Sequence, residues 1–164
     1  MRPDSLLVSV LSRGGNKLDQ YLDVHATLEM RRTGSHTEGV LRVALENKAP
    51  SGEAPYIDGP NPGLSGVNEG DYVGIVTVNL PGVASGGRFD GVSELVVAGA
   101  DGPTRVIGTA IRLPRGGKQT LTARFELPRA EQSLRVQTAA RFPALRWTAV
   151  GASWTDEGAR TVSW

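Results

Sequence analysis

Cysteine is missing from the 164-residue chain, which excludes a disulfide framework and a thiolate zinc site. No run of 18 apolar residues occurs, so the sequence predicts no membrane span in this chain. The formal net charge is only +1, so no strong field attracts nucleic acid or an anionic membrane. We therefore expect neither nucleic acid nor the bilayer interior as a partner.

Helical periodicity is also missing, because apolar residues recur every second position rather than every three to four. Between 22 and 30, Leu22, Val24 and Leu28 share one face, while Asp23 and His25 take the other. The same alternation, interrupted by glycine and proline turns, predicts nine strands after the first apolar run LLVSVLS. They cover 22–30, 41–46, 76–80, 92–99, 106–113, 121–127, 134–138, 145–150 and 161–164.

This pattern predicts one all-β domain over residues 1–164, an antiparallel β-sandwich of about nine strands with immunoglobulin-like, Greek-key connections. The apolar face of the strands predicts the core. Its expected members are Leu22, Val24, Leu28, Leu41, Val43, Leu45, Val76, Val78, Leu121, Phe125 and Leu134.

Two segments interrupt the strand pattern. Gly14-Gly15 ends the first apolar run, and the following residues predict a short helical turn near 16–20 with Asn16 as its cap. Residues 48–71 form a segment too long for an ordinary connection, and such loops are usually functional or mobile. We also expect this loop to tolerate shortening, because loop length itself costs little free energy.

Catalytic chemistry finds little support. The chain has two histidines, His25 and His36, and no serine with the surroundings of a nucleophile elbow. Carboxylate pairs occur, but a glycosidase needs two carboxylates at a fixed separation across a cleft. Oxygens near Asp58 and at 69–71 offer a calcium alternative, although their spacing fits no EF-hand. The sequence therefore predicts no catalytic residue, no metal and no cofactor.

Binding residues are easier to nominate, because loops and aromatic side chains carry recognition on sandwiches. The candidates are Tyr56, Asp58, Asn61 and Asn68 in the long loop, with Trp147 and Trp154 near the C-terminus. Exposed tryptophans would make a sugar platform. The alternative is that they pack in the core or at an interface, since tryptophan carries a large apolar surface.

The order of several blocks resembles the C-terminal β-rich region of an actinobacterial family of exported or membrane-anchored proteins of unknown function. The blocks are GGNKLDQYL, LENKAP, APYIDGPNPG, DYVGIVTVNLPG and RLPRGGKQTLTARFELP. The matching positions are Gly15, Asn16, Lys17, Leu18, Asp19, Tyr21, Leu22, Asn47, Ala49, Pro50, Tyr56, Gly59, Leu80 and Pro81. The resemblance implies an extracellular, cell-envelope location and a link to exopolysaccharide genes. It also implies that the chain is the C-terminal part of a longer protein, and it supplies no catalytic residues.

Three functional hypotheses remain open. The first is a non-catalytic cell-envelope scaffold or interaction module that serves exopolysaccharide assembly. Its partner would be the preceding region of its own full-length protein or an envelope polysaccharide. The second is a carbohydrate-binding module that uses the tryptophans and the loop. The third is a glycan hydrolase, which a cleft holding His25 and two carboxylates would favour.

Overall fold

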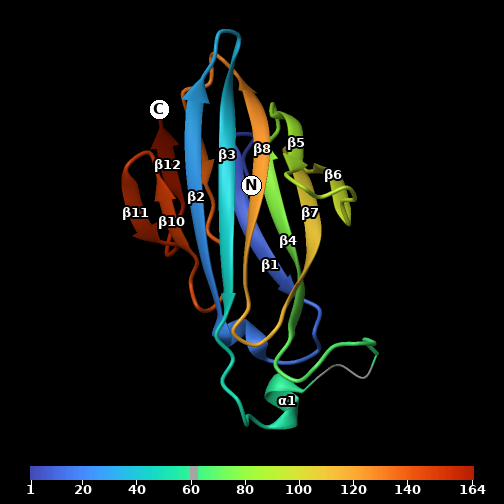
Figure 1. Ribbon diagram of the computed structural model, residues 1–164. Coiled ribbons are helices and arrows are strands. Elements are labelled where there is room, and N and C mark those ends of the chain that lie inside the picture. Colours follow the sequence, from blue (N-terminus) through green and yellow to red (C-terminus); the bar gives the residue numbers. More distant parts are fainter. Residues whose placement is uncertain (60–62) are drawn as a thin grey trace.

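Two six-stranded sheets face each other in the computed structural model, which describes residues 1–59 and 63–164 (Figure 1). In spatial order, the first sheet holds β12 (Arg160–Ser163), β9 (Ser133–Val136), β1 (Ser5–Ser12), β4 (Tyr72–Pro81), β7 (Thr104–Leu113) and β6 (Val97–Asp101). The second holds β11 (Ala152–Thr155), β10 (Arg146–Ala149), β2 (Leu22–Arg32), β3 (His36–Asn47), β8 (Lys118–Pro128) and β5 (Ser85–Phe89). The prediction of an all-β, sandwich-like fold is confirmed.

The core lies between the two sheets, and the predicted members of the apolar face are all buried. Alternation along β2 buries Val24, Ala26 and Leu28 opposite the buried Leu45, Val43 and Leu41 of β3. Phe125 of β8 is fully buried opposite Gly39, where an added Cβ would lie only 2.3 Å from its ring. The period-two pattern therefore identified the inner face of the second sheet correctly.

Two details of the predicted sandwich are wrong. The sheets are mixed rather than antiparallel, because β1 pairs in parallel with β9 and β2 pairs in parallel with β10. Each of these pairs joins strands that are far apart in the sequence, so no hairpin signal marks them. The described residues also form twelve strands rather than about nine. Of the successive strands, those that lie in the same sheet are β2–β3, β6–β7 and β10–β11.

β5 and β11 are strands that the sequence pattern missed. β5 begins Ser85-Gly86-Gly87, and glycine carries no apolar side chain that could reveal an alternation. β11 follows β10 through a two-residue turn at Val150-Gly151, whose φ angles are 46° and 78°. Such a turn normally carries Asn-Gly or Asp-Gly, so a valine at its first central position hides the hairpin.

The helical content of the described residues is limited to η1 (Leu18–Tyr21) and α1 (Pro55–Asp58), both at the lower end in Figure 1. η1 confirms the helical turn expected near 16–20, with Leu18 and Leu22 buried. Asn16 does not cap it, because Lys17 is the N-cap and no side-chain cap bond forms. Between β3 and β4, the described part of the segment 48–71 contains the helix α1 and no strand. No helix among the described residues has the length and apolar character needed to cross a membrane.

Replacing Val150 with asparagine should stabilise the protein. A β-branched residue at positive φ is strained, whereas asparagine accepts this conformation and favours this turn. We expect Val150→Asn to raise the free energy of unfolding by about 1 kcal/mol, measured by urea denaturation.

The control is Val83→Asn, because Val83 is similarly exposed (53% against 51%) and is not among the residues with positive φ. A Val150→Asn variant no more stable than the control would contradict the strained-turn interpretation.

Candidate functional site

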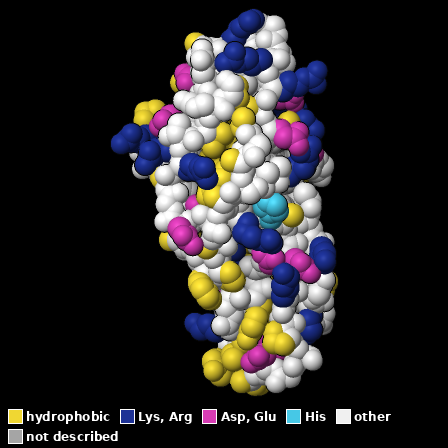
Figure 2. Space-filling model, turned by 90° about the vertical axis from the view of Figure 1, so that its left-hand side faces the viewer, with side chains coloured by type: hydrophobic (Ala, Val, Ile, Leu, Met, Phe, Trp, Pro, Cys, Tyr) yellow, Lys and Arg dark blue, Asp and Glu magenta, His cyan; other side chains and the backbone are white. Residues whose placement is uncertain are grey.

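Two aromatic side chains stand out at the end of the molecule that carries η1 and α1. Among the three Trp, three Tyr and three Phe, the ones that are largely exposed are Tyr56 (71%) and Phe142 (80%). They line the same open hollow of about 500 Å³. We call this surface the aromatic end and define it by Lys17, Asp19, Gln20, Tyr56, Ile57 and Phe142. Figure 2 shows hydrophobic side chains gathered at the same lower end of the molecule.

Asn47, the last residue of β3, anchors the long loop that carries Tyr56. Its buried side-chain amide donates to the carbonyls of Gly70 (2.7 Å), Leu113 (3.0 Å) and Pro114 (3.2 Å). Its Oδ1 accepts from the Ala49 N–H at 3.1 Å. One buried side chain thus joins both ends of the loop to the end of β7.

Asp58, at the end of α1, provides a second anchor for this loop. The carboxylate is fully buried and accepts from Arg115 Nη2 at 3.0 Å, while its backbone carbonyl accepts from the Gly70 N–H at 2.7 Å. Arg115 Nη2 also donates to Glu69 at 3.2 Å. This burial argues against Asp58 as a ligand-binding residue. It also makes shortening of the loop costlier than we expected, because a deletion would remove these anchors.

The remaining candidates of the loop are placed differently. Asn68 is exposed, and its backbone and side-chain N–H groups donate to Asp71 Oδ2 at 3.0 and 3.5 Å. Arg112 Nη2 donates to the same oxygen at 2.6 Å. The oxygens proposed as calcium ligands are therefore already paired with arginines at Asp58 and Asp71. Asn61 lies outside the described residues.

η1 is held to the sandwich by Asp19. Its carboxylate accepts from the buried Tyr72 hydroxyl at 2.9 Å, and Arg141 Nη2 donates to its backbone carbonyl at 3.3 Å and to that of Leu22 at 3.0 Å. Burial, reinforced by the Asp19 carboxylate, raises the pKa of Tyr72, so its hydroxyl remains a donor at neutral pH. These contacts fix the polar residues of η1 beside the aromatic pair.

Asp156 positions the segment that presents Phe142. Its buried carboxylate accepts from the Ala139 N–H at 2.7 Å, and its own N–H donates to the Leu145 carbonyl at 2.9 Å. Burial raises the pKa of Asp156 because the single backbone hydrogen bond only partly offsets the loss of water. Phe142 therefore sits on a segment that is tied down at both sides, with a cis peptide bond to Pro143.

The two candidate tryptophans pack together instead of forming an exposed platform. Trp147 and Trp154 lie directly opposite each other on β10 and β11, and their rings stack with centroids 5.9 Å apart. Trp147 is 1% exposed and Trp154 is half-buried, with the Arg160 guanidinium over its ring at 4.8 Å. Arg160 belongs to the edge strand of the other sheet, so this stack closes one side of the sandwich. The packing alternative is the one that the geometry favours.

A second hollow, of about 230 Å³, lies on the outer face of the second sheet above the small side chain of Ala44. We call it the histidine hollow, and it is lined by His25 and by the charged residues Asp23, Glu46, Lys118 and Arg146. The sequence hypothesis of a hydrolase named this combination of His25 with two carboxylates.

The carboxylates of the histidine hollow are neutralised by neighbouring cations. Asp23 pairs with Lys48 (2.7 Å) and Arg146 (2.8 Å), and Glu46 pairs with Lys118 (3.1 Å). Burial tends to raise the pKa of Asp23, but the hydrogen bonds from Lys48 and Arg146 outweigh it and lower that pKa. Asp23 thus stays ionised at neutral pH, whereas a general acid must hold a proton there.

His25 does contact a hydroxyl. Its Nε2 lies 3.0 Å from Thr148 Oγ1, which lies 3.0 Å from Ser153 Oγ. Nucleophilic catalysis needs such a pair together with a group that orients the imidazole and donors for the oxyanion. The hydrogen bonds of the described residues give His25 no orienting carboxylate. The backbone N–H groups around it belong to the ladders between β10 and its neighbours.

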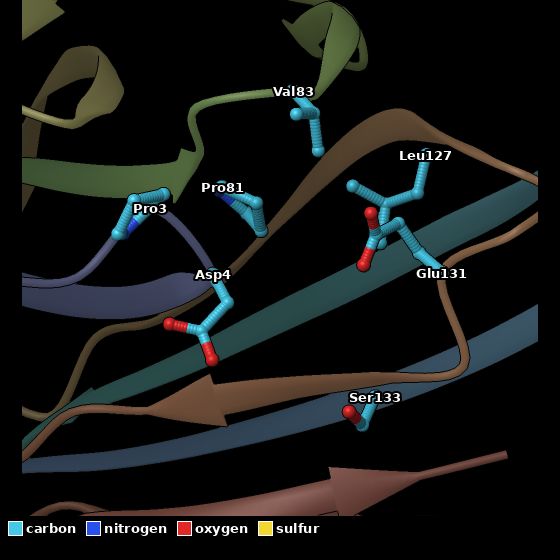
Figure 3. A pocket seen from close by; sticks show the side chains of 7 residues that line it. All are labelled: Pro3, Asp4, Pro81, Val83, Leu127, Glu131 and Ser133. Carbon is cyan, nitrogen blue, oxygen red and sulfur yellow. The ribbon is translucent and has the colours of Figure 1, made fainter.

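A third hollow, of about 100 Å³, lies at the opposite end of the sandwich, where β1 begins and β4 and β8 end. Figure 3 shows the side chains of Asp4 and Glu131 beside those of Pro3, Pro81 and Val83. Its volume corresponds to a few water molecules. Two carboxylates around so small a space do not make a catalytic or metal site, and we assign it no function.

Comparison of the chain with protein-family models, curated proteins and solved structures finds no match. The resemblance to an actinobacterial envelope family therefore stays a prediction.

Sequence reasoning found Tyr56 but missed the rest of the aromatic end. The sequence could not predict that Phe142 is exposed, because this residue lies several positions beyond a predicted strand. Its exposure depends on the contacts that Asp156 and Arg141 make. Lys17 caps η1 and Gln20 lies within it, and the sequence nominated neither as a binding residue. The only sequence signal for Phe142 is that an aromatic residue occurs outside the predicted strands, in the segment Arg-Phe-Pro.

Replacing Asn47 with aspartate should strongly destabilise the protein. The carboxylate would face three carbonyl oxygens that now accept hydrogen bonds, and the Ala49 N–H alone would remain to compensate its buried charge. We expect Asn47→Asp to lower the free energy of unfolding by about 3 kcal/mol or more, measured by urea denaturation.

Ser51→Asp introduces the same charge on the exposed part of the same loop and should change stability little. Equal stabilities for the two variants would show that Asn47 does not anchor the loop.

Proposed function

We propose that this chain is a non-catalytic binding domain of the bacterial cell envelope, an interaction module that serves exopolysaccharide assembly. The envelope location and the link to exopolysaccharide are carried by the sequence resemblance alone. The binding role is supported by one observation, the exposed pair Tyr56 and Phe142 at one end of a well-packed sandwich.

Exposed aromatic residues that cluster, unlike single ones, point to an interaction site, because burying them would stabilise the fold. Here seven of the nine aromatic side chains are buried or half-buried, and the two exposed ones line one hollow. Buried polar groups fix the segments that carry them. Asn47 and Asp58 hold the loop of Tyr56, and Asp156 holds the segment of Phe142. A preorganised aromatic surface of this kind binds a partner at low entropic cost.

An envelope polysaccharide is the partner that we favour over the preceding region of the same protein. Sugar rings present apolar C–H faces that lie flat on aromatic rings, and their hydroxyls bond to neighbouring polar groups. The aromatic end offers both kinds of contact, since Lys17, Asp19 and Gln20 surround the aromatic pair. The carbohydrate-binding hypothesis is thus supported by Tyr56 and Phe142, and no longer by the tryptophans.

A glycan hydrolase remains the second candidate, because the histidine hollow brings His25 together with Asp23 and Glu46. The ion pairs of both carboxylates favour the non-catalytic alternative. The immunoglobulin-like, Greek-key topology also stays a prediction, which the frequent passage of the chain from one sheet to the other supports.

Removing both exposed aromatic rings should abolish binding without harming the fold. We expect Tyr56→Ala combined with Phe142→Ala to lower the affinity for isolated actinobacterial envelope polysaccharides at least tenfold, in affinity electrophoresis or calorimetry. Leu11→Ala is the matched control, because Leu11 is 54% exposed and does not line the hollow. Unchanged binding by the double variant would refute this proposal.

Incubation of the protein with the same polysaccharides should release no reducing sugar, and His25→Ala should leave this baseline unchanged. A reducing-end assay at neutral and mildly acidic pH measures it. Sugar release by the wild type that His25→Ala abolishes would establish the hydrolase instead.

A further inference from the structure

We propose that the aromatic end selects a saccharide bearing a carboxylate, such as a uronic acid residue, and that Lys17 recognises the acid group. This inference rests on the proposed function, because it names the ligand class for the same surface. Three observations carry it: the state of Lys17, the charge balance of the hollow and its shape.

Lys17 differs from the other two lysines of the chain. Lys48 pairs with Asp23 at 2.7 Å, and Lys118 pairs with Glu46 at 3.1 Å. Lys17 is exposed, and no described residue accepts a hydrogen bond from its ammonium or forms an ion pair with it. Its backbone N–H, in contrast, is held by the Ile57 carbonyl at 2.9 Å. The backbone is therefore fixed beside α1 while the cation remains available to a ligand.

The carboxylate of Asp19 does not cancel this positive charge. Asp19 already accepts from the Tyr72 hydroxyl, and the guanidinium of Arg141 lies beside it, bonded to the Asp19 and Leu22 carbonyls. Burial lowers the pKa of Arg141, but an arginine remains charged in a protein. Among the residues that line the hollow, Lys17 is the cation and Asp19 the carboxylate, and the neighbouring Arg141 offsets the charge of Asp19.

Other acidic groups near the loop are engaged elsewhere. Glu53 accepts from the Tyr21 hydroxyl at 3.1 Å and does not line the hollow. Asp58 is buried under Arg115. A ligand carboxylate placed at Lys17 therefore meets a cation that no described residue pairs, whereas a neutral sugar would leave Lys17 without a partner.

The shape of the hollow suits a sugar ring within a chain. Its volume of about 500 Å³ lies in the range of roughly 300–1,000 Å³ that small-molecule sites occupy. Tyr56 and Phe142 supply exposed aromatic surface, and the half-buried Ile57 adds apolar contact between the loop and η1. Because the hollow is open to solvent, a polysaccharide can continue beyond the bound ring. Gln20, also exposed, offers an amide for hydroxyl groups.

The experiment compares a galacturonic acid oligosaccharide with its methyl ester, which keeps the ring and removes the charge. Calorimetry measures both ligands against the wild type and against Lys17→Met, Lys17→Arg and Lys118→Met. We expect the acid to bind about fivefold more tightly than the ester, as one exposed ion pair allows. Lys17→Met should abolish this preference, Lys17→Arg should retain it, and high salt should weaken it. Lys118→Met, whose cation lies on another face, should behave as the wild type.

Equal binding of acid and ester, or a preference that survives Lys17→Met, would overturn this inference. The proposed function would still stand in that case, provided that Tyr56→Ala lowers the affinity for both ligands. Absence of any binding to either oligosaccharide would also overturn the inference. The proposed function fails separately, if the double aromatic variant binds isolated envelope polysaccharides as well as the wild type does.

Discussion

The side-chain amide of Asn47 holds together the end of the molecule at which recognition is proposed. Within the sandwich, the strands satisfy one another's backbone groups, but at the end of β3 the ladder stops and the carbonyls of Gly70, Leu113 and Pro114 converge. Asn47 donates to all three and accepts from Ala49, so that a loop of more than twenty residues leaves and re-enters the sheets at fixed points. The pair of Asp58 and Arg115 then fixes α1. The position of Tyr56 therefore depends on Asn47 and on this pair.

The histidine hollow and the aromatic end are the two candidate binding surfaces, and they differ in how far their charges are paired within the protein. Around the histidine hollow, cations and carboxylates alternate from Arg146 through Asp23, Lys48 and Glu46 to Lys118, and nearly every charge is met within the protein. A ligand there would have to break an existing pair. At the aromatic end, Lys17 and the rings of Tyr56 and Phe142 have no such partner within the described residues. Groups that the fold leaves unsatisfied are the ones that can gain free energy from a ligand.

The tryptophans show how the sandwich closes its sides. Trp147 and Trp154 stack across β10 and β11, and Arg160 of the opposite sheet's edge strand covers the stack. The indole N–H groups of both tryptophans find no acceptor within the described residues, so the stack is held by apolar contact and the cation above it. An edge covered in this way is also less open to pairing with another chain.

The sequence by itself determined the all-β class, the inner face of the strands and the extent of the long loop, because alternation and turn residues act over a few neighbouring positions. It could not reveal the parallel pairs β1–β9 and β2–β10, the hairpin at Val150 or the strand β5, since these depend on distant segments or break the usual turn chemistry. The candidate site divides in the same way. Tyr56 was predictable from its loop. The burial of Asp58 and Trp147, the exposure of Phe142 and the lack of a described partner for the Lys17 ammonium were not. Each of these properties depends on which side chains, distant in the sequence, lie next to the residue in the folded protein. Only the tertiary structure decides which side chains those are.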